Sequence, residues 1–508
     1  MEMVRNLFEK HMIISKTTFL NFLKCPKNAW LKIHDSNLLE EFTLSPFDLQ
    51  LREQGNEVDV VARKLFPKGV LVTKKAEEGQ DETSTYIKAK VPAIFQASFL
   101  SDAFLAKCDI LEYDETNQNW NLLEVKASNA VSEDGPEEKD HVTDLAFQAI
   151  ILRRAKLPIG KYFLIHINKE YIRWGDIDVA SLFIREDISS EVIARMEALE
   201  SKMEAAKEYL SREKEPLGPC DCIYGGRSSH CETFQYSNPD IPKYGVHDIA
   251  NIREKKLTLL MERKVYTLDD IPDDFNLTDN QWNQVHAHRS KKPIVDKEAI
   301  KSELDSLRFP LYFFDYEAFG LAIPPFDGYA PYKKIPFQYS LHVLREPGAK
   351  LEHFEFLHEE NSDPTEAVIA RLKAEIKPGG TVIAWSMSFE AGVNKDIIER
   401  VPSAAPFFEM VNSSLYDLRK IFLKQYYVHH GFVGKTSLKK VLPTLSDKRY
   451  DTLKIQEGGQ AVEEWLKMFS PNTTPAKRAE IAEDLKKYCG LDSIAMYDIW
   501  KYLVDLVS

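Results

Sequence analysis

The chain has 508 residues, a formal net charge of −13 at pH 7, and 44% hydrophobic and 29% charged residues. These values describe a globular protein of roughly two to four domains. The acidic balance argues against a broad basic surface for nucleic acid, but leaves room for a local basic groove. No apolar run reaches the roughly 18 residues that span a bilayer, and residues 1–5 lack the apolar region of a signal peptide. We therefore expect a cytoplasmic protein without a membrane partner, and the oligomeric state is left open.

The first predicted elements are a short strand and several helices. Residues 13–35 are typical of a short strand followed by a helix, with Ser15 as its N-cap. Another helix is predicted over residues 54–66, which end at a proline- and glycine-containing stop signal, and residues 84–90 continue the helical pattern.

Three strands are predicted next, over residues 93–99, 106–113 and 120–127. The polar loop at residues 114–119 joins the last two as a hairpin. These strands and the helices around them predict a mixed α/β fold for the first half of the chain.

Two acids and a lysine fall on the strands of this hairpin. Asp109 lies on one strand, and Glu124 and Lys126 lie two apart on the next, so the latter two share a face. The acids are suitable ligands for a metal ion. The lysine is suited to orienting or helping to deprotonate an attacking water, or to stabilising the charge on a phosphate. A surface Glu–Lys pair is the common alternative. The helix that follows, with Asp144 and Gln148, favours the metal site.

This order of residues resembles the PD-(D/E)xK nuclease superfamily, in its RecB-like branch of the CRISPR-associated exonuclease type. The resemblance implies that Asp109 and Glu124 hold Mg²⁺ or Mn²⁺, and that Lys126 and Gln148 are catalytic. The family usually carries a histidine where this chain has Asp59, which we therefore expect as a metal ligand, with Glu57 as the alternative.

The cysteines extend the resemblance. Six are too few for a disulfide scaffold, but three of them lie close together in the sequence and indicate metal or cluster ligation. The RecB-like branch often adds a cysteine from the first helix, which implies a [4Fe–4S] cluster tying that helix to the domain's C-terminal end. The C-x-C-x8-C spacing departs from the family, so His230 is an alternative ligand and Zn²⁺ an alternative metal. The expected ligands are Cys25, Cys220, Cys222 and Cys231.

The middle of the chain is predicted to be helical. A long helix is expected from Ser189 to about Arg212, and short helices over residues 250–262, 279–289 and 296–307. Proline-rich joins and the absence of a strand pattern predict a helical connector. Its basic residues suit phosphates, but a solvated charged face is the favoured interpretation.

The run at residues 311–319 is apolar and aromatic except for two acids, and predicts a buried strand. Asp315 and Glu317 project from the same face of such a strand. Two buried carboxylates repel one another, and a divalent cation is the natural compensation. The alternative is an edge strand whose acids face water.

Further strands are predicted over residues 337–344, 353–358 and 381–385, with a helix over residues 364–376 and another opening at Ser388. Three strands before a helix, with the acids on the first strand, are typical of an RNase H-like sheet.

These elements resemble the DEDD, proofreading-type 3′–5′ exonuclease superfamily. Asp315 and Glu317 match its first motif, and Glu390 stands where its second motif has an aspartate. Tyr488 and Asp492 match the last motif, one helical turn apart. The resemblance implies that the four acids hold two Mg²⁺ or Mn²⁺ ions, while Tyr488 orients the attacking water. Asp417 is a further acid near this set.

A basic segment is expected beside this site, because Lys435, Lys439 and Lys440 precede or open a helix and suit a phosphate backbone. Residues 426–430 hold aromatics that suit base stacking, with a structural use as the alternative. Residues from about 300 to 440 also resemble a bacterial domain of unknown function commonly found behind a RecB-like nuclease.

Together these resemblances imply three parts: a PD-(D/E)xK nuclease domain over residues 1–240, a helical connector over 241–305, and an RNase H-like DEDD exonuclease domain over 306–508. We expect a metal-dependent nuclease acting on DNA, on single strands or ends, with a role in DNA repair or mobile-element defence. The alternatives are an RNA exonuclease and a non-catalytic nucleic-acid-binding scaffold with degenerate sites.

Overall fold

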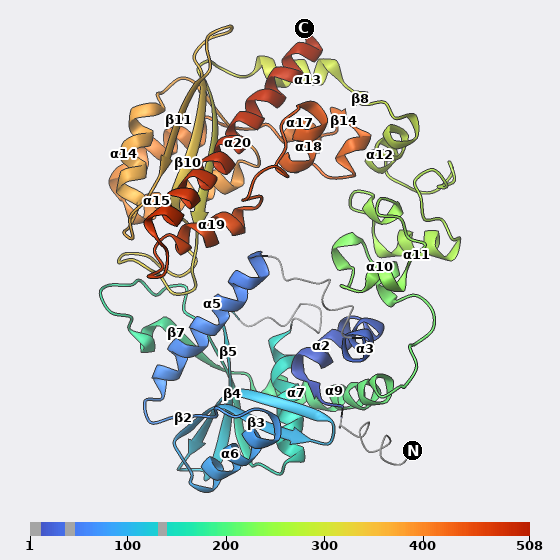
Figure 1. The fold of residues 1–508 in the computed structure, drawn as a ribbon, viewed down its shortest axis with the longest axis vertical. Coiled ribbons are helices and arrows are strands. Elements are labelled where there is room, and N and C mark those ends of the chain that lie inside the picture. Colours follow the sequence, from blue (N-terminus) through green and yellow to red (C-terminus); the bar gives the residue numbers. More distant parts are fainter. Residues whose placement is uncertain (1–11, 36–45, 131–139) are drawn as a thin grey trace. The chain divides into compact units, whose positions relative to one another are not determined.

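The computed structural model describes residues 12–35, 46–130 and 140–508 (Figure 1). The chain divides into two compact units. Unit 1 comprises Met1–Leu44 and Leu51–Pro239, and unit 2 comprises Ser45–Gln50 and Asp240–Ser508. The predicted mixed α/β fold is confirmed, and residues 241–305, expected as a connector, cluster with unit 2. Within the described ranges, no helix combines the length and the apolar character needed to cross a membrane.

Unit 1 is built on one mixed sheet. Its strands run in the order β2-β3-β4-β5-β6-β7, and β1 pairs in parallel with β4. Strands β3, β4 and β5 are antiparallel neighbours, whereas β6 pairs in parallel with β5. The strands are β1 (Ile14–Ser15), β2 (Val70–Leu71), β3 (Ala93–Ser101), β4 (Phe104–Asp114), β5 (Asn119–Lys126), β6 (Ile159–Ile167) and β7 (Phe183–Asp187).

Helix α7 packs on this sheet and brings polar residues to the end of β5. Apolar side chains of β4, β5 and α7 share one core, which also receives the inner face of α9. The described helices of the first half are α2 (Lys16–Lys24), α3 (Pro26–His34), α5 (Pro46–Ala62), α6 (Ala76–Lys88), α7 (His141–Arg154), α8 (Val179–Leu182), α9 (Ser189–Leu210) and α10 (Phe234–Ser237).

The prediction of one helix after the first strand was wrong in one respect. The chain forms two helices, because Pro26 lacks a backbone N–H and disfavours helical geometry in the residue before it. Cys25 is therefore extended, with φ −159°, and serves as C-cap of α2 and N-cap of α3. The expected N-cap is present, since the Ser15 hydroxyl accepts a hydrogen bond from the Thr18 backbone at 3.2 Å.

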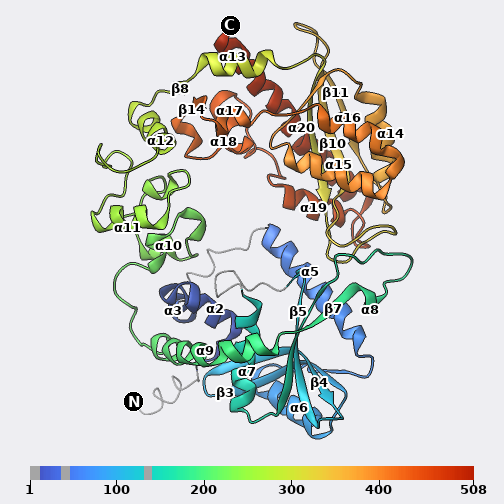
Figure 2. The same ribbon diagram turned by 180° about the vertical axis from the view of Figure 1, so that it is seen from behind.

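Unit 2 holds a five-stranded sheet in the order β11-β10-β9-β12-β13. Strands β10 and β11 of this sheet are labelled in Figure 2. Strands β9, β10 and β11 are antiparallel neighbours, and β12 and β13 continue the sheet in parallel with β9. The strands are β9 (Leu311–Phe319), β10 (Ile335–Leu344), β11 (Glu352–Leu357), β12 (Thr381–Ala384) and β13 (Leu415–Asp417).

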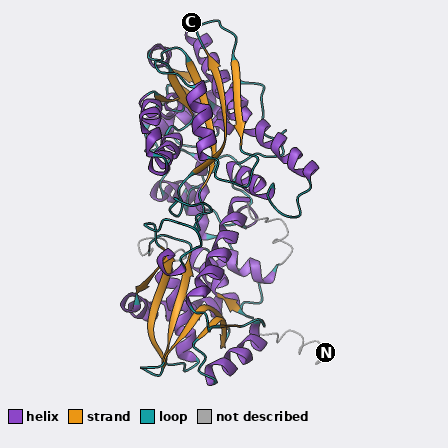
Figure 3. Ribbon diagram, turned by 90° about the vertical axis from the view of Figure 1, so that its left-hand side faces the viewer, coloured by secondary structure: helices purple, strands orange, loops and turns teal. Residues whose placement is uncertain are grey.

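Helices lie on both sides of this sheet (Figure 3), and alternate residues of β9 enter two different cores. Tyr312, Phe314 and Tyr316 pack with α14, α15 and α16, whereas Leu311, Phe313 and Phe319 pack with α18, α19 and α20. Because strand side chains alternate, the odd-numbered acids of β9 point toward the second group of helices. These helices are α14 (Thr365–Glu375), α15 (Ser388–Arg400), α16 (Ala405–Ser413), α18 (Leu438–Leu445), α19 (Gly458–Lys467) and α20 (Pro475–Val507).

The expected connector is helical but also contributes a strand. Its helices are α11 (Glu254–Glu262), α12 (Asp279–Ser290) and α13 (Lys297–Asp305). The two-residue strand β8 (Ile294–Val295) pairs with β14 (Tyr427–Val428), which follows the short α17 (Lys420–Leu423). The predicted lack of strand in this stretch was therefore wrong at these two residues. A two-residue strand is too short to show an alternating pattern, and its pairing partner lies over 100 positions away, so the local sequence does not indicate it.

Candidate metal centres

Four cysteine sulfurs of unit 1 converge, each within 4.8 Å of the others. Cys25 comes from the junction of α2 and α3, and Cys220, Cys222 and Cys231 come from the irregular segment after α9. All four side chains are buried and none forms a disulfide. Four buried thiols in one cluster form a group that could hold a metal ion.

Polar neighbours hold the cysteines in place. The Asn28 backbone donates to the Cys25 sulfur at 3.4 Å, and the Asn238 amide donates to the Cys220 sulfur at 3.2 Å. Hydrogen bonds among the four cysteines lower the pKa of Cys220 and raise those of Cys25 and Cys231, as expected where thiols share protons in a cluster without a metal ion.

The same neighbours tie the first helices to the segment that carries the other three cysteines. The Asn28 side-chain oxygen accepts from the Thr233 backbone at 3.2 Å and from its hydroxyl at 2.9 Å. Lys27 donates to the Gly218 carbonyl at 2.7 Å. His230, the alternative ligand, lies outside the four-sulfur group, and its ring contacts the Gly225 carbonyl at 3.2 Å.

A second group in unit 1 gathers around the buried Glu124. Its Oε1 lies 2.8 Å from the Lys16 ammonium and 2.8 Å from the Lys126 ammonium. Its Oε2 accepts from Gln148 at 2.7 Å. Both lysines and Gln148 also contact Asp144, at 2.5–3.1 Å. Burial raises the pKa of Glu124, but the charges of Lys126 and Lys16 outweigh burial and lower it.

Asp109 and Asp59 are joined through a glutamine. The Gln96 amide donates to Asp109 at 3.2 Å and to Asp59 at 3.3 Å. Burial and the charge of Glu124 raise the pKa of Asp109 to about 7. Asp59 also pairs with Arg63, and its Oδ1 is buried without a hydrogen-bond partner among the described residues. Glu124, Lys126 and Gln148 thus share one set of side-chain contacts and Asp109 and Asp59 another, and the Val125 backbone, which donates to Asp109 at 3.0 Å, lies between the two sets.

The acids of β9 form the third group. Ligand atoms of Asp315, Glu317 and Cys489 all lie within 4.8 Å of one another. The Cys489 sulfur lies 3.7 Å from Asp315 Oδ2. Burial raises the pKa of Asp315 well above its ordinary value, and the charges of Asp492, Glu317 and Glu390 add to the shift. Burial likewise raises the pKa of Glu317.

Glu390, in the first turn of α15, lies near enough to this group for its charge to raise the pKa values of Asp315 and Glu317. Its side chain is 2% exposed, and Oε2 has no hydrogen-bond partner within residues 12–35, 46–130 and 140–508. Burial raises its pKa to about 8, and the charge of Asp417 contributes. Asp417 is itself held by the backbones of Ser386 and Arg419, at 3.1 and 3.0 Å. A buried acid without a partner is costly unless a cation or proton compensates it.

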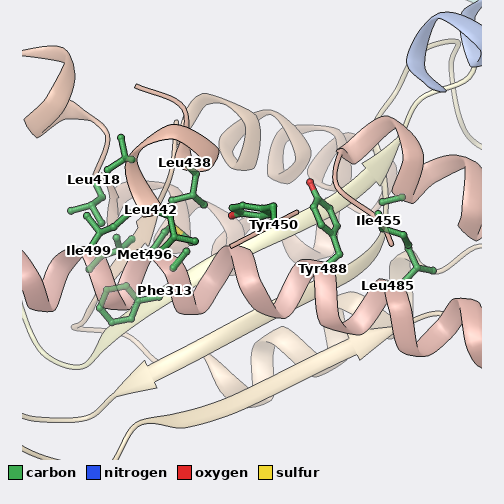
Figure 4. Packing of buried hydrophobic residues seen from close by; sticks show 14 of the residues in the cluster. Phe313, Leu418, Leu438, Leu442, Tyr450, Ile455, Leu485, Tyr488, Met496 and Ile499 are labelled. Atoms are coloured by element: carbon green, nitrogen blue, oxygen red, sulfur yellow. The ribbon is translucent and has the colours of Figure 1, made fainter. Parts of the chain in front are cut away.

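Helix α20 supplies Tyr488, Cys489 and Asp492 to the same place. The Tyr450 hydroxyl donates to Asp492 at 2.5 Å, and its ring lies beside that of Tyr488 (Figure 4). Burial raises the pKa of Asp492 to about 6, against the Tyr450 hydrogen bond and the Lys439 charge. Lys439 lies 5.8 Å from both ring centres.

The three lysines of the expected basic segment occupy different environments. Lys439 faces the acids, since its charge lowers the pKa of Glu317 against burial. Lys440 is exposed on α18. Lys435 is exposed before that helix and lines a cavity formed with residues of α11 and α12.

Sequence reasoning missed four residues of these groups. Lys16 is an ordinary first-turn lysine, so nothing local distinguishes it. Gln96 has φ +56°, an unusual value for a strand residue that no sequence pattern reports. Cys489 directly follows the motif tyrosine, and Tyr450 lies in an irregular segment. Cys489 had a signal, because it is adjacent to Tyr488 and one turn from Asp492.

Part of unit 2 is similar to a family of known sequences. Residues 312–437 match the family model "Domain of unknown function (DUF2779)", which confirms the expected domain of unknown function for these residues. The "Uncharacterized protein MG366 homolog" of Mycoplasma pneumoniae is 25% identical over 256 residues. That alignment covers 46% of this chain and 38% of the relative, so the chain spans well under half of the relative's length. No solved structure matches.

Proposed function

We propose that this chain is a metal-dependent nuclease that hydrolyses phosphodiester bonds in DNA, with single strands or ends as substrates. The observation that carries the proposal is the grouping of Asp315 and Glu317, whose ligand atoms and that of Cys489 all lie within 4.8 Å of one another. Glu390 and Asp492, from two other elements, are near enough for their charges to raise the pKa of Asp315. The sheet agrees with the resemblance, since three antiparallel strands precede a helix and the acids lie on the first strand.

The donor set fits Mg²⁺ or Mn²⁺. Carboxylate oxygens are the ligands that these ions prefer, and Glu390 Oε2, which has no hydrogen-bond partner among the described residues, is available as a ligand. Two such ions supply an activated water and stabilise the leaving oxygen. Tyr488 presents its hydroxyl beside Asp492 for orienting that water, and Lys439 is placed to offset charge on the phosphate.

Unit 1 has the parts of a second nuclease site, and one observation favours a different use for it. The oxygens of Glu124 and Asp144 are already neutralised by Lys16 and Lys126. Ion pairs of this kind stabilise a buried acid without a metal. The second candidate function is therefore a non-catalytic unit 1 that contributes binding or scaffolding to an exonuclease in unit 2.

One experiment separates these functions. End-labelled single-stranded DNA and RNA are incubated with Mg²⁺ or Mn²⁺ and with wild type, Asp315→Ala, Lys126→Ala or the exposed-acid control Glu355→Ala. The proposal expects 3′ laddering by wild type and Glu355→Ala, and its loss in Asp315→Ala. Loss in Lys126→Ala as well assigns activity to unit 1, whereas retention favours scaffolding. Absence of cleavage by wild type with either metal rejects the enzyme, and faster cleavage of RNA selects an RNA exonuclease.

For the cysteine site we propose that the four thiolates hold a single Zn²⁺ ion in tetrahedral coordination. Zinc–sulfur bonds of about 2.3 Å place neighbouring sulfurs about 3.8 Å apart in a tetrahedron. The Cys220 and Cys231 sulfurs are 3.8 Å apart. A [4Fe–4S] cluster carries its cysteines outside an eight-atom core and so separates their sulfurs further. Metal analysis of anaerobically purified protein tests this: one zinc per chain supports it, and iron together with inorganic sulfide rejects it.

A further inference from the structure

Unit 2 contains a cavity of about 890 Å³ that lies apart from the acids. Its walls come from two stretches that are distant in sequence: the segment around α11 and α12 forms one side, and the stretch from Arg419 to Ser437 forms the other. A cavity of this volume is in the range of small-molecule and nucleotide sites.

The lining of the cavity is cationic in an otherwise acidic protein. It includes Arg253, Lys256, Arg419 and Lys435, and none of its lining residues is an aspartate or glutamate. The chain as a whole carries a net charge of −13. A concave surface of one sign, walled by protein, concentrates its field on ions of the opposite sign.

Two of these cations have no partner in the described part of the chain. Neither the Arg253 guanidinium nor the Lys435 ammonium forms an ion pair or hydrogen bond with a described residue, and both are exposed. Lys256 and Arg419 are held in place, by Gln281 at 3.3 Å and by the Thr436 hydroxyl at 3.0 Å. The cavity therefore combines fixed and free cations, which suits an extended anion.

The cavity is connected to the acidic group through the chain. The Arg419 backbone donates to Asp417 at 3.0 Å, and the charge of Asp417 raises the pKa of Glu390. The aromatic rings at its wall, Tyr427 and Phe422, are buried in the core, so the cations carry the recognition. Cations that meet successive phosphates bind a nucleic-acid backbone without reading its bases.

We infer that this cavity anchors the phosphate backbone of the single strand whose end reaches Asp315, an inference that rests on the proposed nuclease function. Arg253 and Lys435 neutralise phosphates, while Lys256 and Arg419 line the path between them. A free nucleotide or inorganic phosphate offers the same chemistry, so the test includes both.

Binding of fluorescein-labelled oligothymidylate is measured by anisotropy in EDTA, where metal-dependent cleavage cannot occur. The double variant Arg253→Gln/Lys435→Gln is compared with wild type and with Lys373→Gln, an exposed lysine of α14 that removes a similar charge elsewhere. Losing two phosphate contacts lowers the slope of log K against log salt by about 1.4 and weakens binding roughly tenfold. Lys373→Gln is expected to match wild type.

Equal affinity and equal salt slope in the double variant and wild type would overturn the inference, as would absence of oligonucleotide binding by wild type. Competition by AMP or inorganic phosphate at concentrations equal to the oligonucleotide would also overturn it, in favour of a small phosphate ligand. The nuclease function is judged separately by cleavage with Mn²⁺. If the double variant binds more weakly but wild type does not cleave, the result supports the binding role of the cavity and rejects the nuclease function. If wild type cleaves but the double variant binds as wild type does, the result supports the nuclease function and rejects the binding role.

Discussion

The Lys16 ammonium lies 2.8 Å from Oε1 of Glu124, although 108 positions separate the two residues. Lys126 contacts the same oxygen from two positions further along β5. A carboxylate with 1% exposure is thus compensated by two cations and one amide. Removing one member of a buried charged group leaves the others undercompensated.

We therefore expect Lys16→Met to lower the unfolding free energy of unit 1 by about 1–2 kcal/mol in EDTA, with the partial exposure of Lys16 limiting the loss. A divalent ion bound by Glu124 replaces the lost charge, so Mn²⁺ restores stability. Urea unfolding with and without Mn²⁺ measures both effects. Lys24→Met, an exposed change on the same helix, serves as control. If Mn²⁺ stabilises neither wild type nor Lys16→Met, Glu124 does not bind the ion.

Tyr450→Phe tests how Asp492 is positioned. The change removes the hydroxyl that donates to Asp492 at 2.5 Å and keeps the ring beside Tyr488. Loss of a hydrogen bond to a ligating carboxylate weakens metal affinity or activity by roughly 10–100-fold. Calorimetric titration with Mn²⁺ reads the affinity. Tyr502→Phe removes a comparable hydroxyl pair, to Tyr427 at 2.9 Å, in the same unit. Equal Mn²⁺ affinity in both variants would show that Tyr450 does not act on the site.

The buried His342 makes the stability of unit 2 depend on pH. Burial lowers its pKa from 6.5 to about 3, and the charges of His353 and Lys448 add to the shift. The unfolded chain therefore takes up the proton first, so stability is retained above about pH 6.5 and lost as pH falls toward about 3. In His342→Asn, we expect the unfolding free energy to fall less steeply between about pH 6 and about pH 4, by up to about 1.4 kcal/mol per pH unit.

Urea unfolding of unit 2, followed by limited proteolysis at each pH, measures this slope. Asparagine does not titrate in this range and can still hydrogen-bond Ser493, which the His342 ring contacts at 2.8 Å. His286→Asn, an exposed change on α12, is expected to leave the slope as in wild type. An unchanged slope in His342→Asn would mean that another group causes the loss of stability in acid.

Asn28→Ala tests whether the hydrogen bonds around the cysteine site are needed for metal binding or only for stability. The change leaves the buried Thr233 backbone and hydroxyl without their acceptor, at a cost of about 1–3 kcal/mol. The four cysteines are untouched, so the metal content stays near wild type while thermal stability falls. Cys222→Ser, by contrast, is expected to lose the metal. Elemental analysis beside thermal melts distinguishes the two, and metal loss in Asn28→Ala would make Asn28 essential for ligation.

Elements with strong local patterns were predicted well. Strand β9 occupies residues 311–319 as expected, because its aromatic run and its alternation are local properties. The split at Pro26 was missed although the proline was visible. The short strand β8 and the strands β6 and β7 were not expected, because their definition depends on pairing partners elsewhere in the chain.

The sequence by itself determined which side chains carry the chemistry: the acids of β9, the Glu-x-Lys pair of β5 and the clustered cysteines. Their types and spacings are local, and alternation alone orients Asp315 and Glu317 together. Only the tertiary structure decided what each group meets. Lys16 reaches Glu124, Cys489 joins Asp315, and Arg253 shares a cavity with Lys435, through contacts across more than a hundred residues. Charge compensation and cavity shape depend on such long-range contacts, which leave no periodic trace in the chain.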